Sequence, residues 1–306
     1  MSLFRGLGEI APGFFALGSG ATPVYLLDGP HPVLFEAGFG RLGMVYRQAI
    51  EAVLGDRHPE YLLITHSHFD HVGAAGHLKR AFPGMKVAAS ARAAEILRRP
   101  NARALIGALN AEVDSALKGL DPAGLVDEAF IPFEVDLILG EGDEVDLGGH
   151  RVRVMATPGH TWDFLSYFIP EKGILVPSES VGCADPTGYV VCDFLVDYDV
   201  YMGNLRRQST LGARVLAQGH HFAYLDDTVA DFFRRSEAAS IRYRELVLDL
   251  LGRTGGDQEA VVASLKALEW DPRPLPKQPE KAYLLNTRAR VRFFAEQAGG
   301  AHAARV

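Results

Sequence analysis

The chain has 306 residues, of which 48% are hydrophobic and 23% charged, and its formal net charge at pH 7 is −7. This composition is ordinary for a globular protein and excludes a fibrous or wholly disordered chain. The sequence contains no apolar run of the roughly 18 residues that a membrane span needs, and its interrupted N-terminus does not resemble a signal peptide. The acidic balance argues against a nucleic-acid partner, and with only two cysteines we expect a cytoplasmic protein without a disulfide framework.

The first 90 residues alternate short apolar strands with helical patterns. Strands are expected at 24–27, 33–35, 61–64 and 87–89. Helices are expected at about 41–54 and 72–82, between those strands. Residues 91–118 are rich in Ala, Leu, Arg and Glu, and this composition predicts one continuous helix.

Strand patterns return near residue 136 and give way to helices in the last quarter of the chain. The expected strands are at 136–139, 143–147, 151–155, 165–169, 173–176 and 214–217, with a helix at about 197–210. Gly148 and Gly149 predict a hairpin turn between the second and third of these strands.

The sequence changes character after residue 227. Apolar residues recur at helical spacing over 229–251, and a helical pattern continues over 257–269. Four prolines then predict an extended linker at about 271–279, before a last helix at about 281–297. We therefore predict an α/β body over residues 1–227 and a helical extension over residues 228–306.

Four potential metal ligands lie within six residues directly after the expected strand 61–64. They are His66, His68, Asp70 and His71. Side chains alternate along an extended segment, so His66 and His68 project to the same side, and the following turn lets Asp70 and His71 approach from another direction. Imidazole and carboxylate groups suit Zn²⁺ and its first-row neighbours, and crowding them without a cation would be costly. The cluster predicts a metal site.

Two later loops add histidines in the same kind of position. His160 follows the strand 151–155 in a loop with Gly159, and His220 follows the strand 214–217 in a loop with Gly219. A Gly-His pair alone is more often a simple turn than a ligand. Together with the first cluster, however, these histidines provide enough ligands for two metals.

These motifs resemble the metallo-β-lactamase fold superfamily of metal-dependent hydrolases. Residues 66–71 match its HxHxDH signature in full, and His160 and His220 match its two later ligand histidines in order. The resemblance covers roughly residues 15–225 and implies a four-layer αββα sandwich with the metals at one edge of the two sheets.

The resemblance also implies how the ligands are shared between two metals. One metal would be held by His66, His68 and His160. The other would be held by Asp70, His71 and His220.

The sequence departs from the superfamily at one ligand. Members with two metals usually carry a bridging Asp after the strand that follows the Gly-His loop, whereas residues 174–182 contain no Asp. Glu179 falls best on that position, with the same charge and one more methylene, so we expect it to be the bridging ligand. The alternative is that Glu179 faces solvent and only one metal binds tightly. Asp185 lies too late in the sequence to be a good substitute.

Such a centre predicts a hydrolase. Two divalent cations, Zn²⁺ in the first place and Fe or Mn as alternatives, lower the pKa of a shared water and polarise the bond that it attacks. Asp70 is assigned a second, catalytic role as the acceptor that orients this water. We expect cleavage of an ester, thioester, lactone or phosphodiester bond in a small-molecule substrate. The candidates for contact with that substrate are Trp162, Tyr198, Tyr201 and His221.

Within the superfamily, the long helical tail is more similar to glyoxalase II-like thioesterases and quinolone-signal-response-type proteins than to periplasmic β-lactamases. Two other functions stay open. Absence of the bridging Asp is compatible with a mononuclear iron enzyme that performs oxygen chemistry, such as persulfide oxidation. A non-catalytic regulatory protein would only bind a ligand, and the complete ligand set argues against it. Residues 91–118 and the C-terminal helices are expected either to form a lid over the site, or to pack on the sandwich only or form an interface in a homodimer.

Overall fold

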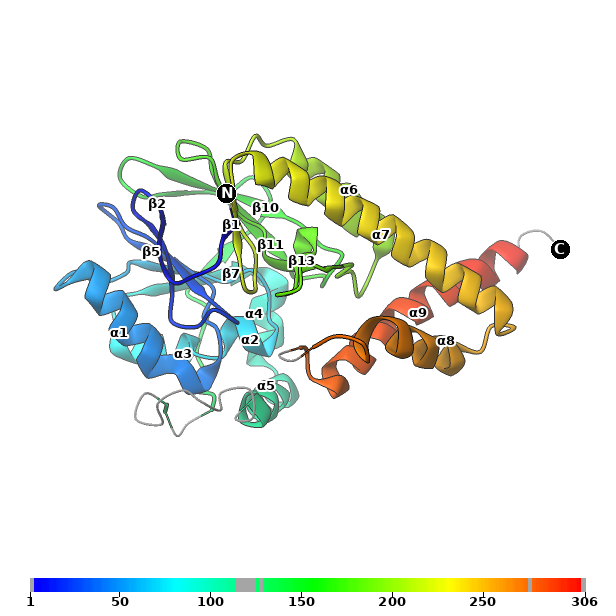
Figure 1. The fold of residues 1–306 in the computed structure, drawn as a ribbon. Coiled ribbons are helices and arrows are strands. Elements are labelled where there is room, and N and C mark those ends of the chain that lie inside the picture. Colours follow the sequence, from blue (N-terminus) through cyan, green and yellow to red (C-terminus); the bar gives the residue numbers. More distant parts are fainter. Residues whose placement is uncertain (1–2, 114–124, 127–128, 275–276, 304–306) are drawn as a thin grey trace.

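The computed structural model describes residues 3–113, 125–126, 129–274 and 277–303. Two seven-stranded sheets stack on each other (Figure 1). The first sheet has the order β2 (Gly8–Ala11), β3 (Phe14–Leu17), β4 (Val24–Leu27), β5 (Val33–Phe35), β6 (Tyr61–Leu63), β7 (Lys86–Ser90) and β8 (Leu137–Leu139).

The second sheet contains the very N-terminal strand and the later strands of the chain. Its order is β1 (Leu3–Phe4), β16 (Ala223–Leu225), β15 (Val215–Ala217), β12 (Ile174–Val176), β11 (Leu165–Ile169), β10 (Arg151–Ala156) and β9 (Glu144–Asp146). A separate two-stranded hairpin consists of β13 (Cys183–Ala184) and β14 (Val190–Val191). β9 and β10 pair antiparallel across the predicted glycine turn.

Helices cover the outer faces of both sheets (Figure 1). The first sheet is covered by α1 (Gly43–Leu54), α2 (Phe69–Val72), α3 (Ala75–Ala81), α4 (Ala91–Arg98) and α5 (Pro100–Glu112). The second sheet is covered by α6 (Tyr198–Ser209) and the long α7 (Asp227–Arg253), on which α8 (Gln258–Leu265) and α9 (Glu280–Ala303) pack.

The strands bury both faces, which is why they are almost continuously apolar. Along β4, for example, Tyr25 and Leu27 join the core between the two sheets, whereas Val24 and Leu26 join the core under α1. A third core lies between the second sheet and the C-terminal helices. These three cores separate four layers, and the predicted αββα sandwich with a C-terminal helical segment is confirmed.

Several expected boundaries were wrong. The continuous helix expected over 91–118 is broken at Arg99, because Pro100 has no N–H for a helix interior and instead begins α5; residues 114–118 lie outside the described part. The helix expected over 72–82 corresponds mainly to α3, which begins at Ala75. It is preceded by a separate short helix, α2, which ends at Val72. The strands β1–β3, β16 and the β13–β14 hairpin were not predicted, because short strands give little periodic signal.

The C-terminal extension has its helices close to the expected positions, with α7 over Asp227–Arg253 and α8 over Gln258–Leu265. After α8 the chain continues as a π-helical turn, Lys266–Trp270, and α9 begins at Glu280 and runs to Ala303. α7 starts two residues after β16 and packs against α6, β14 and β16. The domain boundary at 227/228 stays a prediction.

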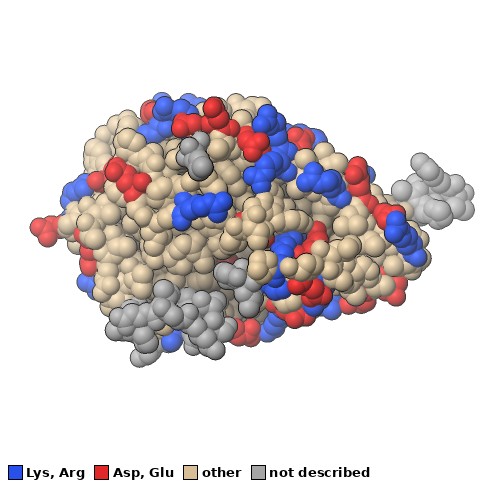
Figure 2. All heavy atoms as spheres, viewed as in Figure 1, with Lys and Arg blue, Asp and Glu red and all other residues tan. Residues whose placement is uncertain are grey.

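Surface charge and hydropathy add two observations. On the face shown in Figure 2, acidic and basic side chains are interspersed along the C-terminal helices. Among the residues that the structure describes, no helix combines the length and the apolar character needed to cross a bilayer.

We predict that Gly76→Ala destabilises the protein by ~1–3 kcal/mol, the usual cost of overpacking a core. A Cβ on Gly76, inside α3, would lie 2.1 Å from the carbonyl oxygen of Ile131. Gly203→Ala is the matched control, because Gly203 is exposed inside α6 with free space around it. That substitution should stabilise the protein by about 0.5–1 kcal/mol. Urea unfolding measures both changes, and equal stabilities for the two variants would contradict the packing argument.

Candidate metal centre

The predicted ligands converge at one edge of the sandwich, where strand ends from both sheets meet. His66 and His68 lie in the loop after β6, and Asp70 and His71 lie in α2, the helical turn that follows this loop. From the second sheet, His160 lies in the loop after β10 and His220 in the loop after β15.

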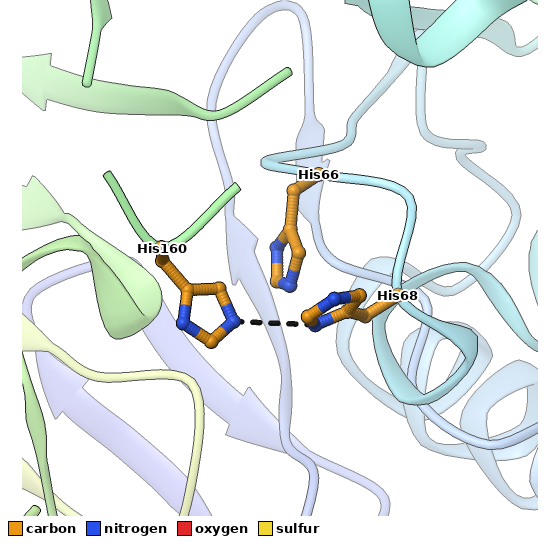
Figure 3. Close-up of side chains that lie close together, drawn as sticks. All are labelled: His66, His68 and His160. Carbon is orange, nitrogen blue, oxygen red and sulfur yellow. Dashed lines mark hydrogen bonds between the residues drawn. The ribbon is translucent and has the colours of Figure 1, made fainter. Parts of the chain in front are cut away.

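The first ligand group consists of His66, His68 and His160. One ring nitrogen from each lies within 4.8 Å of the others. Nε2 of His160 is 3.2 Å from Nδ1 of His68. Figure 3 shows the three rings, two from the loop after β6 and one from the loop after β10, around a common space. Nε2 of His66 is buried without a hydrogen-bond partner in the described chain.

The second ligand group consists of Asp70, His71 and His220, and their ligand atoms also lie within 4.8 Å of one another. Glu179, in the 3₁₀ turn Ser178–Val181 after β12, lies between the two groups. Its Oε1 is 3.0 Å from Nε2 of His71 and 2.9 Å from Nε2 of His220, and its Oε2 is 3.9 Å from Nε2 of His66.

These contacts suit a cation better than hydrogen bonds. Within the described chain, Glu179 Oε1 has no hydrogen-bond partner despite the close approach of two rings. Buried polar atoms normally find a partner, and unpaired ones point to an ion or water. The nitrogen and oxygen donors assembled here are those that first-row divalent metals prefer. The residues present therefore fit a metal centre.

In three of the ligand histidines, the ring nitrogen that does not face the other ligands lies against a hydrogen-bond acceptor. Nδ1 of His160 donates to the carbonyl of Asp193, and Nδ1 of His220 donates to the carbonyl of Ala21 at 2.9 Å. Nδ1 of His71 lies 3.2 Å from Oε1 of Glu36. Such partners set the tautomer and leave Nε2 as the free ligand atom.

Glu36 belongs to the candidate site, and the sequence reasoning missed it. It directly follows β5, is 1% exposed and has a positive φ of 66°. Besides His71, its Oε1 accepts a hydrogen bond from Thr65 Oγ1, which lies 2.9 Å from Nδ1 of His66. A carboxylate at the end of an apolar strand parallel to β6 was the available signal, because parallel strands end at the same sheet edge.

Local geometry makes room for a glutamate at position 179. Ser178 has a positive φ of 48°, and its Oγ donates to Glu179 Oε2 at 2.8 Å. A Cβ on Gly219 would lie only 2.3 Å from Glu179 Oε1. The glycine before His220 is therefore required for the longer carboxylate to reach this position.

The two ligand groups differ in their protonation in the absence of metal. Burial lowers the pKa of His66 and His68, and it lowers the pKa of His160 to about 3. Burial also acts to lower the pKa of His71 and His220, but the neighbouring Glu179 carboxylate outweighs it. The pKa of His71 is raised well above its usual value, and that of His220 is raised to about 9.

The residues proposed to contact substrate occupy two different environments. Trp162 follows His160 closely and is 45% exposed at the rim of the site. His221 is half-buried beside His220, with a φ of 64°. Tyr198 and Tyr201 are buried in the core beneath α6: Tyr198 Oη donates to the carbonyl of Ser240, and Tyr201 interacts with the Ser240 side chain. The tyrosines thus face the interior rather than the rim.

Comparison with known proteins agrees with this architecture. A hydroxyacylglutathione hydrolase of Nitrobacter winogradskyi is 30% identical over 125 residues, which are 40% of this chain and 35% of the relative. An atrochrysone carboxyl ACP thioesterase of Aspergillus fumigatus is 24% identical over 254 residues, which are 81% of this chain and 67% of the relative. The chain thus spans only about a third of the length of the hydrolase that it matches.

Solved structures show the same fold. A metallo-beta-lactamase family protein from Thermus thermophilus matches with a TM-score of 0.65 and 22% identity, over 95% of both chains. The family model of the metallo-beta-lactamase superfamily matches residues 17–220, well over half of the sequence and the whole span of the ligands. The chain belongs to the metallo-beta-lactamase superfamily, whose members include hydroxyacylglutathione hydrolase and thioesterase relatives of this protein.

Proposed function

We propose that this protein is a hydrolase with two divalent metals that cleaves a thioester or ester bond of a small molecule. The observation that carries the proposal is the position of Glu179, within 3.0 Å of ring nitrogens from two ligands and facing His66 of the other group. Glu179 thus supports a bridging role in place of the usual Asp. The names of the two relatives, a thioesterase and a hydroxyacylglutathione hydrolase, favour acyl substrates over phosphodiesters.

The chain's own residues supply orientation and proton transfer. Divalent metals, with Zn²⁺ as the first choice, would lower the pKa of a water and polarise the carbonyl that it attacks. Asp70, with an 18% exposed side chain, is open enough to accept a proton from that water and to orient it. The ligand rings are kept in fixed orientations by Glu36, Asp193 and Ala21. Little reorganisation of these rings is therefore needed during the reaction.

We predict that Glu179→Ala lowers the bound metal from two equivalents to about one, because the substitution removes the carboxylate shared by both groups. Elemental analysis of protein purified without chelator measures this. Glu51→Ala is the control, since the Glu51 side chain on α1 is 40% exposed and, within the described chain, forms an ion pair only with Arg47. One equivalent in both the wild type and Glu179→Ala would refute the two-metal proposal and favour the mononuclear iron alternative, which oxygen consumption would then test.

The affinity for the two metals should depend differently on pH. At pH 7 a pKa of about 9 keeps His220 protonated in the metal-free protein, and a metal must displace that proton. Affinity for the Asp70–His71–His220 group should therefore rise about tenfold per pH unit for each proton displaced, and the contribution of His220 to this rise should end above pH 9. Because lowered pKa values keep His66, His68 and His160 neutral, affinity for their group should stay flat from pH 7 to 9.

Competition titration of Zn²⁺ against a chromophoric chelator at pH 7, 8 and 9 measures these two affinities. The chelator's own protonation is measured in parallel and subtracted. Equal pH slopes for both equivalents would contradict the protonation states inferred for the two groups.

Asp70→Asn should lower kcat for a thioester by about 10²–10⁴-fold, the usual contribution of a general base. The fully metallated wild type should hydrolyse S-acetylglutathione faster than bis(4-nitrophenyl) phosphate. Metal analysis of the variant separates loss of the base from loss of a ligand. Absence of turnover across thioesters, esters, lactones and phosphodiesters would overturn the hydrolase proposal and support a non-catalytic, ligand-binding protein.

A further inference from the structure

A buried arginine that makes no direct ion pair within the described chain lies on the C-terminal helix α9. Arg290 is 2% exposed, and its Nε has no hydrogen-bond partner among the described residues. Among the described residues no carboxylate lies within ion-pair distance of its guanidinium. Arg288 on the same helix is different: its side chain is 46% exposed and pairs with Glu259 at 2.9 Å. A surface arginine with a partner is ordinary, whereas a buried arginine without one is costly to fold.

Four buried hydroxyl groups lie on the helices around this guanidinium. They belong to Tyr201 of α6, Ser240 and Tyr243 of α7, and Thr287 of α9. Ser240 interacts with Tyr201 and Thr287 with Tyr283, whereas Tyr243 Oη has no hydrogen-bond partner in the described chain. The guanidinium carbon of Arg290 lies 5.4 Å from the ring centroid of Tyr243. Thr287 and Arg290 are three residues apart, as are Ser240 and Tyr243, so each pair shares one face of its helix.

The acidic residues nearby do not satisfy Arg290. Asp193 and Glu269 act on its charge from beyond direct contact. Glu269 accepts hydrogen bonds from Tyr189 Oη at 2.6 Å and from Tyr283 Oη at 3.4 Å, so both of its oxygens have partners. Arg290 can only donate hydrogen bonds, and the hydroxyl groups near it can each donate one. Their natural complement is an acceptor-rich anion.

This donor cluster adjoins the metal centre. The main-chain carbonyl of Asp193 holds Nδ1 of the ligand His160, and the side chain of Asp193 interacts electrostatically with both Glu179 and Arg290. Asp193 is thus near both the ligand His160 and Arg290.

We propose that Arg290, with the hydroxyls of Tyr243 and Thr287, binds a carboxylate group carried by the substrate. A single guanidinium with neutral hydroxyls matches one negative charge, and its planar fork matches the two oxygens of a carboxylate. The C-terminal extension would then determine which acyl compounds are accepted. This inference rests on the proposed function for its substrate, but the binding site can be tested without turnover.

The binding test uses glutarate and its neutral isostere glutaramide as probes of the metal-loaded protein. Calorimetry should detect glutarate binding to the wild type at least tenfold tighter than glutaramide binding. Arg290→Met should abolish this preference, whereas the matched control Arg288→Met should keep it. Undiminished glutarate preference in Arg290→Met would overturn the proposal.

Thermal unfolding distinguishes a binding arginine from a structural one. Removing an unpaired buried charge should leave the Tm of Arg290→Met unchanged or raise it, because binding groups are commonly kept at the expense of stability. A fall of more than a few degrees would mean that Arg290 supports the fold, and would count against the proposal. Tyr243→Phe removes only one hydroxyl, and it should weaken glutarate binding several-fold at an unchanged Tm.

Turnover provides an independent arm. S-acetyl-3-mercaptopropionate and S-propyl thioacetate differ only in a carboxylate that replaces a methyl group. The wild type should show a lower KM for the first, and Arg290→Met should equalise the two KM values, whereas Arg288→Met should keep both the KM difference and the turnover of the wild type. If the wild type cleaves neither compound, the hydrolase proposal fails, and the glutarate experiment still tests the carboxylate site. If the wild type cleaves both compounds with equal KM values, the carboxylate site is refuted and the hydrolase proposal stands.

Discussion

The constraint on which this structure depends is the crowding of five imidazoles and two carboxylates at one edge of the sandwich. Groups of this kind repel one another or lose hydration when buried, so only a compensating charge makes their assembly favourable. Glu179 compensates part of the cost, because its carboxylate raises the pKa of His71 and His220. The lowered pKa values of His66 and His160 and the unpaired Nε2 of His66 show where compensation is missing. That remainder is what metal ions would supply.

The rest of the fold holds this crowded edge in place. Both sheets are buried on two faces, so their strands are rigid supports whose ends deliver ligands from distant parts of the chain. Outside the ligands, Glu36, Asp193 and Ala21 orient the rings. Glu36, Ser178 and His221 take positive φ values close to the centre. Strain of this kind persists only where surrounding structure enforces it, and here it lies next to the candidate metal centre.

The C-terminal extension contributes more than a cover for the second sheet. Its helix α9 carries the buried Arg290, whose charge interacts with Asp193, and the main-chain carbonyl of Asp193 holds the ligand His160. The same extension contacts the β13–β14 hairpin, where Arg273 stacks on Tyr189 at 3.6 Å and pairs with Asp185. A metal centre common to a whole superfamily would thus acquire its substrate preference from the part of the chain that lies beyond the matched family region.

The sequence by itself determined the metal-ligand motif, the αββα class and most of the strands. Closely spaced ligands such as HxHxDH and continuous apolar runs are local patterns, so they can be recognised without knowledge of tertiary contacts. It could not reveal Glu36, whose role depends on β5 ending beside β6, or the break at Arg99, where one proline overrides good helix formers. Tyr198 and Tyr201 looked like candidates at the site, yet the packing of α6 turns them into the core. Whether Glu179 faces solvent or the ligands was also decided only by the folded chain. The physical reason is that burial and partners come from residues far apart in sequence, which only packing brings together.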